Sequence, residues 1–182
     1  MGLGRVPFAA ALVVVALCAM PSLAAAQGTG CSFTRSAATA EPEPNVRTAL
    51  RCLVNATRQQ HGLSSLRSSS RLNVAADRHS ADMVARGYFA HVTPDGRSVT
   101  DRVRATGYLG GSPDWALGED IGWGTGSAST PAAIFRAFME SPPHRKIILS
   151  RHFHEIGVGV SPGVPVSGEG SGATFVLDFG DH

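Results

Sequence analysis

Apolar residues in the first half of the chain recur every three or four positions, which is the period of an amphipathic helix. One such run starts at Asn45 and stops at Gly62. Its apolar positions are Val46, Ala49, Leu50, Leu53 and Val54. A second run spans about 71–86, with Ser70 as candidate N-cap and Gly87 as the residue that ends it. Its inner face carries Leu72, Ala75, Ala76, His79 and Met83. The pattern predicts two long helices.

Cap residues mark shorter helices farther along. Ser98 and Asp101 resemble a capping box and open a short helix that ends at Ala105. Thr130-Pro131 is an N-cap followed by proline at the first helical position. The apolar face of the helix that follows carries Ile134, Phe135 and Phe138. Pro142-Pro143 ends this helix, and one or two further turns are expected after it.

Strand patterns come late in the chain. Residues 156–161 alternate between β-branched residues and small ones, and residues 174–179 are rich in β-forming residues. The Gly-, Ser- and Pro-rich stretch between them predicts a hairpin loop, and a third strand is expected over 117–121. The polar stretch 64–70 and the glycine-rich stretch 122–126 are expected to be loops. Helices followed by an antiparallel sheet predict a layered α+β domain.

The N-terminus has the pattern of a secretory signal peptide. Residues 1–5 carry one positive charge, residues 6–20 are apolar apart from one proline, and Ala24-Ala25-Ala26 supplies small residues for cleavage before Gln27. The alternative is a membrane anchor, but the apolar run is shorter than the roughly 20 residues that span a bilayer. We therefore expect a signal peptide over residues 1–26 and no transmembrane segment.

Removal of that peptide leaves two cysteines. The expected organisation is an N-terminal tail or linker over 27–44 and one domain over 45–182. Cys18 is lost with the signal peptide, and the even number that remains in an exported chain favours a disulfide between Cys31 and Cys52, with two free thiols as the alternative. Closing this loop would contribute roughly 3 kcal/mol.

Charge adds little to the functional picture. The chain carries 16 Lys+Arg against 14 Asp+Glu, a net charge of +2. No basic run is longer than two residues. Electrostatic capture of nucleic acid or of an anionic membrane is therefore not indicated.

Histidines and carboxylates are the candidates for chemistry. His91 lies where a helix gives way to a turn, Glu119 lies in a predicted strand, and His144 follows the proline pair, with Glu140 four residues before it. Two imidazoles and one or two carboxylates can form a divalent-cation site, although their spacing matches no local metal motif. His79 lies on an apolar helix face and is expected to be a hydrogen-bonded core histidine. No nucleophile elbow, His-Glu-x-x-His motif or phosphate-binding loop is present.

The order of short motifs along the chain resembles that of a known protein family. The motifs are Cys52-Leu53-Val54-Asn55-x-x-Arg58, Leu72-x-x-Ala75-Ala76-x-x-His79-Ser80-x-Asp82-Met83, Gly87-Tyr88-Phe89-x-His91-x-x-Pro94-Asp95-Gly96, Arg102, Gly107-Tyr108, Gly118-Glu119-x-Ile121, Ser141-Pro142-x-His144-Arg145-x-x-Ile148-Leu149, Phe153-x-Glu155-Ile156-Gly157-Val158-Gly159 and Asp178-Phe179-Gly180. Over about Val46 to Gly180 the chain resembles the bacterial branch of the CAP superfamily, also called SCP-like extracellular or PR-1-like domains.

The resemblance implies a three-layer α-β-α sandwich with a central antiparallel sheet and an open cleft. In eukaryotic members two histidines and two glutamates line this cleft and can hold zinc or another divalent cation. His91, Glu119 and His144 match three of these positions. The position of the other glutamate falls on Ser141, with Glu140 one residue short of it.

Two residues beside Glu119 depart from the family pattern. Asp120 stands where the family usually has asparagine, and Gly122 stands where alanine is common. We expect both changes to alter the polarity beside Glu119.

The resemblance implies no single reaction, because members have been linked to sterol and lipid binding, to protease or nuclease activity and to protein interaction. We expect a secreted or cell-envelope binding module for a lipid, glycan or protein ligand, since no nucleophile is identifiable. The alternative is a metal-assisted hydrolase, with His91 and His144 as ligands of zinc or another divalent cation and Glu119 as ligand or general base. We also expect a monomer.

Overall fold

The structure is a computed structural model that describes residues 30–111, 113–166 and 170–182. Its helices are α1 (Glu43–Gln60), α2 (Ser70–Arg86), α3 (Val99–Arg104), η2 (a 3-10 helix, Gly126–Ser129), α4 (Pro131–Glu140) and α5 (Pro142–Ile148). Its strands are β1 (Arg67–Ser68), β2 (Ala116–Thr125), β3 (Glu155–Pro162) and β4 (Gly172–Asp181). The signal peptide predicted over residues 1–26 lies outside the described residues. Among the residues that are described, no helix is both long and apolar enough to cross a membrane.

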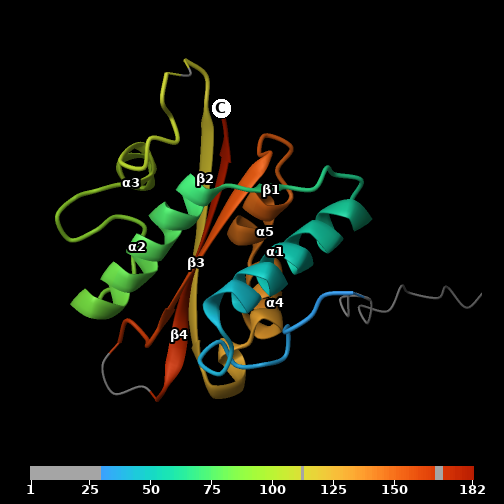
Figure 1. The fold of residues 1–182 in the computed structure, drawn as a ribbon, viewed down its shortest axis with the longest axis vertical. Helices are drawn as coiled ribbons and strands as arrows, with labels where there is room; N and C mark the ends of the chain where they lie inside the picture. The colour runs from blue at the N-terminus through green and yellow to red at the C-terminus, as the bar shows by residue number, and fades with distance from the viewer. Residues whose placement is uncertain (1–29, 112, 167–169) are drawn as a thin grey trace, which may run out of the picture.

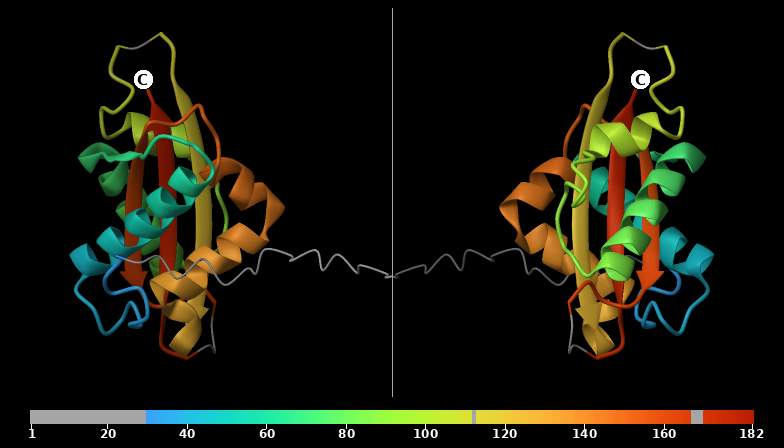
Figure 2. Two further views of the ribbon diagram at one scale, coloured as in Figure 1. Left: turned by 90° about the vertical axis from the view of Figure 1, so that its right-hand side faces the viewer. Right: turned by 90° about the vertical axis from the view of Figure 1, so that its left-hand side faces the viewer.

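The strands form one sheet with the order β1-β3-β4-β2. The pairs β2–β4 and β3–β4 are antiparallel, and the two residues of β1 add a short parallel pairing at the outer edge of β3. Helices α2 and α3 lie on one face of the sheet, and α1, α4 and α5 lie on the other (Figures 1 and 2). The α+β class and the three-layer α-β-α arrangement are therefore confirmed.

Each face of the sheet has its own core. Phe175, Leu177 and Phe179 of β4 are fully buried in the larger core, which α1, α4 and α5 complete. Val176 of the same strand points to the opposite face and packs with Met83 of α2. The alternation of side chains along β4 thus distributes apolar area to both helical layers.

Helix α2 lies directly on β3 because β3 carries glycines where the two meet. A β-carbon at Gly157 would lie 2.2 Å from the main chain of Leu72, and one at Gly159 would lie 2.2 Å from the main chain of Ala76. The glycines that alternate along this strand are therefore required for close approach of the helix.

Several details differ from the sequence expectations. Helix α2 is capped by Ser69, not by Ser70. The stretch 64–70 is not entirely loop, because it contains β1. The expected loop over 122–126 was wrong, since β2 continues to Thr125. Its glycines serve packing instead: the ring of Phe138 and the main chain of Ala128 would lie within 3.0 Å of β-carbons at Gly122 and Gly124, respectively.

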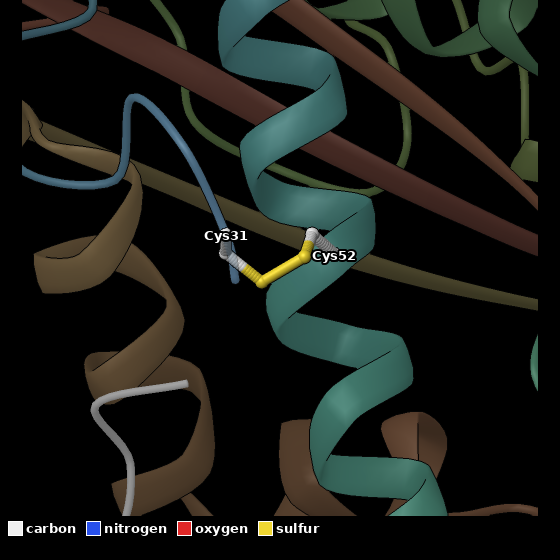
Figure 3. Close-up of a disulfide and its surroundings, with 2 residues drawn as sticks. All are labelled: Cys31 and Cys52. Atoms are coloured by element: carbon white, nitrogen blue, oxygen red, sulfur yellow. A yellow bond between two sulfur atoms is a disulfide. The ribbon is translucent and has the colours of Figure 1, made fainter. Parts of the chain in front are cut away.

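The structure forms the disulfide between Cys31 and Cys52, with 5.7 Å between their α-carbons. Figure 3 shows that it joins the N-terminal segment to the middle of α1. The same segment is also bonded at Ala38, whose N–H donates to the carbonyl of Ser129, and at Thr34, whose carbonyl accepts from Ala132. The disulfide thus fastens a segment that already lies along η2 and α4.

Removal of the disulfide is expected to destabilise the domain without unfolding it. The double variant Cys31→Ser/Cys52→Ser should lose about 3 kcal/mol in free energy of unfolding, since the unfolded chain gains loop entropy. The other contacts of the segment remain, so the domain should still fold. Urea unfolding measures this loss. A reductant should lower the stability of the wild type to that of the variant and leave the variant unchanged. Equal stabilities of wild type and variant in oxidising buffer would contradict the expectation.

Candidate functional site

His91 and Glu119 come together at the surface end of a buried polar network. The left-handed Gly87 (φ 65°) ends α2, and the chain then turns into the loop that carries His91. Glu119 projects from β2 toward this loop, and His91 Nδ1 lies 2.8 Å from Glu119 Oε1. The side chain of His91 is 54% exposed and that of Glu119 only 3%. We call this pair the His91–Glu119 site.

Arg102 of α3 holds the second oxygen of Glu119. Its Nη2 donates to Glu119 Oε2 at 2.5 Å, and its Nη1 donates to the carbonyls of His91 and Arg97. Burial would raise the pKa of Glu119, but the hydrogen bond from His91 and the charge of Arg102 outweigh it, and the pKa lies below the usual value. Glu119 is therefore ionised at neutral pH, with both oxygens engaged.

The ionised Glu119 decides which nitrogen of His91 is free. A carboxylate can only accept hydrogen bonds, so His91 Nδ1 carries the proton that it donates. In the neutral imidazole, Nε2 is then an unprotonated acceptor on the exposed side chain. The site thus presents a fixed lone pair to a ligand.

Behind the site lie two fully buried residues, His79 and Asp178. His79 Nε2 donates to the carbonyl of Ala90 at 3.1 Å and lies 3.9 Å from Glu119 Oε2. The expected hydrogen-bonded core histidine is confirmed. Asp178 is the cross-strand neighbour of Glu119, and burial, followed by the charge of Glu119, raises its pKa well above the usual value. A neutral Asp178 avoids a second negative charge beside Glu119.

On the other face of β2, Asp120 and His144 point into the layer of α4 and α5. Asp120 is fully buried, and neither of its oxygens has a hydrogen-bond partner among the described residues. Burial, followed by the charge of Glu119, raises its pKa to about 8. The ring of His144 lies 5.2 Å from that of Phe138, and its buried Nδ1 likewise has no partner in the described part of the chain. Burial and then the charge of His91 lower the pKa of His144.

The four candidate residues are brought together only in part. His91 and Glu119 are in contact, whereas His144 packs against Phe138 on the other face of β2. Glu140 is exposed at the end of α4, and its side chain has no hydrogen bond or ion pair with other described residues. Within residues 30–111, 113–166 and 170–182, no three His, Cys, Asp or Glu side chains are arranged to hold a metal ion.

Arg102 is the main residue whose role the sequence did not show. It shares a helix face with Val99 and Val103, and a charged residue on an apolar face is a signal of a buried ion pair. Its partner, however, lies 17 residues away on another element. Only the fold brings Arg102 to Glu119.

Comparison with known proteins agrees with this fold. The model of the cysteine-rich secretory protein family (CAP) matches residues 52–179. The uncharacterized protein YkwD of Bacillus subtilis is 36% identical over 107 residues, which cover 59% of this chain and 39% of YkwD. The match therefore spans well under half of that relative.

Solved structures show the same architecture. An extracellular protein of Bacillus anthracis that contains an SCP domain is similar with a TM-score of 0.61 and 25% identity, over 75% of this chain and 40% of that one. An outer surface protein of Borrelia burgdorferi is similar in fold, with a TM-score of 0.59 and 16% identity, over 73% of this chain and 90% of the Borrelia protein.

Proposed function

Since this chain belongs to the cysteine-rich secretory protein (CAP) family, we propose that it is an extracellular binding module whose ligand contacts His91. The Nε2 atom of His91 accepts a hydrogen bond from a ligand or binds a cation. The ligand is a lipid, glycan or protein of the extracellular space or cell envelope. Two observations support this location: the similar proteins are an extracellular and an outer surface protein, and a disulfide joins Cys31 to Cys52.

The surroundings of Glu119 are the observation that favours a binding role over a hydrolase. A general base needs a free lone pair within reach of a water or nucleophile. Each oxygen of Glu119 already accepts a hydrogen bond, one from His91 and one from Arg102, and the side chain is 3% exposed, so a water or substrate has little access to the lone pairs that remain. Glu119 is therefore suited to orient His91 and not to take a proton from a substrate. The metal-assisted hydrolase remains the alternative to be tested.

The residues that would hold a zinc or other divalent cation are His91 and His144. His91 Nε2 and the unpartnered nitrogen of His144 are the candidate ligands, and the Glu119–His91 contact is the arrangement that orients metal-bound histidines. A cation in this position would supply a Lewis acid for an anionic or carbonyl group of a ligand. Glu119 then acts behind His91 and is not a third ligand.

Zinc titration by calorimetry at pH 7.5 tests the cation. The full chain should bind one zinc ion, and His91→Ala/His144→Ala should not. Glu119→Gln should weaken binding roughly 10- to 100-fold, because the imidazole loses its orienting carboxylate. His154→Ala is the matched control, since His154 is an exposed histidine paired with Asp181 and should not affect zinc binding.

The outcomes separate the two functions. Turnover of ester, peptide or nucleic-acid substrates by the wild type that is lost in His91→Ala would refute the binding module in favour of the hydrolase. Absence of zinc binding to the wild type would refute the proposed cation site. The binding module then predicts that phospholipid vesicles, glycans or an envelope protein bind the metal-free chain, and that His91→Ala weakens this binding.

A further inference from the structure

The loop that carries His91 is held at two consecutive carbonyls. The carbonyl of Ala90 accepts from His79 Nε2 at 3.1 Å, and the carbonyl of His91 accepts from Arg102 Nη1 at 2.9 Å. The donors come from α2 and α3, and both residues are at least nine-tenths buried. The main chain on either side of His91 is therefore fixed by two donors that do not themselves reach the surface.

The same two donors lie against the same oxygen of Glu119. Arg102 Nη2 lies 2.5 Å and His79 Nε2 lies 3.9 Å from Glu119 Oε2, while His91 takes Oε1. The carboxylate of Glu119 thus lies between the imidazole of His91 and the two side chains that hold the main chain at His91. A shift of either donor would move both the loop and the partner of His91 Nδ1.

His79 has only one proton for this task. The carbonyl of Ala90 can only accept, so Nε2 carries the hydrogen. Burial lowers the pKa of His79, which favours the neutral ring and leaves Nδ1 as an acceptor. That nitrogen lies 3.4 Å from the hydroxyl of Tyr88, which donates to Asp82 at 2.5 Å. Because the one proton of that hydroxyl goes to Asp82, His79 Nδ1 accepts no hydrogen bond from Tyr88. The ring of His79 is therefore held by its single N–H, which it donates to the loop.

We propose that His79 is a positioning residue for His91. Its hydrogen bond to the Ala90 carbonyl keeps the His91 ring in register with Glu119, so that the proton stays on Nδ1 and the lone pair of Nε2 faces outward. The inference rests on the proposed function only where it assumes that a ligand binds this lone pair. The position of the proton is a property of the unliganded chain.

Nitrogen-15 NMR of the full chain at pH 7.5 tests the inference, because the resonances of a protonated and an unprotonated ring nitrogen are well separated. The wild type should show His91 protonated at Nδ1. His79→Leu removes the donor and should move both His91 nitrogens toward the positions of a mixture of tautomers. His79→Gln can restore an amide donor to the Ala90 carbonyl and should retain the wild-type pattern.

Ser80→Ala is the control for a general loss of stability. Ser80 is the fully buried neighbour of His79 on α2, and its hydroxyl bonds to the carbonyl of Asp77 and to Ser161 of β3. This variant should be destabilised and keep the wild-type His91 pattern. The inference is overturned if His79→Leu also keeps that pattern, or if wild-type His91 is protonated at Nε2. A wild-type pattern as expected, in a chain that binds no zinc and no other ligand through His91, would refute the proposed function alone.

Discussion

Replacement of Arg58 by methionine is expected to lower the free energy of unfolding by about 4 kcal/mol, because it leaves buried main-chain groups without partners. Arg58 lies on α1, is 1% exposed and, among the described residues, donates only to carbonyls. These belong to Ser64, Ile148, Ser150 and Phe153, at 2.7 to 3.3 Å. One side chain thus ties α1 to the end of α5 and to the segment before β3.

The size of the effect follows from what methionine preserves. Methionine keeps most of the apolar volume of the arginine stem, so the loss measures the hydrogen bonds and not a cavity. Arg51→Met is the matched control, since Arg51 is half-buried on the same helix and makes no side-chain hydrogen bond or ion pair with the described residues. Urea unfolding should show a change below about 0.5 kcal/mol for Arg51→Met. Similar losses for the two variants would refute the role assigned to Arg58.

Arg58 also shows which contacts cannot be predicted from the sequence. Periodicity predicted α1, and Arg58 continues the apolar stripe that runs through Leu50 and Val54, which is already a signal of a buried arginine. Three of its four acceptors, however, lie 90 to 95 residues away along the chain. Contacts at that separation depend on how the layers assemble, and no local pattern encodes them.

The candidate site, too, was only partly predictable from the sequence. The resemblance to the family identified His91 and Glu119, whereas their spacing of 28 residues did not. The strand expected over 117–121 implies that Glu119 and Asp120 point to opposite faces. Which face meets the loop of His91, and which meets α4 and α5, is decided by the pairing of β2 with β4 and by the helices that cover each side. The sequence therefore predicted the alternation but not its consequence for Asp120.

The consequence of this alternation is that the carboxyl group of Asp120 lies in an apolar core. Gly118 and Gly122 flank Asp120 on the same face of β2, and the rings of Phe153 and Phe138 press against the strand at these glycines. The alternation leaves Asp120 as the side chain between them. With no hydrogen bond to either oxygen among the described residues, its charged form is strongly disfavoured.

Asp120→Asn is therefore expected to stabilise the protein, increasingly so as the pH rises. An aspartate in the unfolded chain titrates near pH 4, whereas burial raises the pKa of Asp120 in the folded chain to about 8. Below about pH 4 the carboxyl is protonated in both states and carries no penalty. Between these values the unfolded chain releases the proton that the folded chain retains, so the stability of the wild type falls with rising pH, and above about 8 the whole penalty is present.

The asparagine variant lacks this titration, so its advantage should grow from near zero at pH 4 to about 3 kcal/mol at pH 9. A gap of four pKa units corresponds to roughly 5 kcal/mol, and the buried amide, which also lacks partners, offsets part of it. Urea unfolding at intervals between pH 4 and pH 9 measures the difference. Glu140→Gln, which neutralises an exposed carboxylate, should run parallel to the wild type throughout. A constant difference between wild type and Asp120→Asn across this range would contradict the expectation, because it would show that folding does not raise the pKa of Asp120.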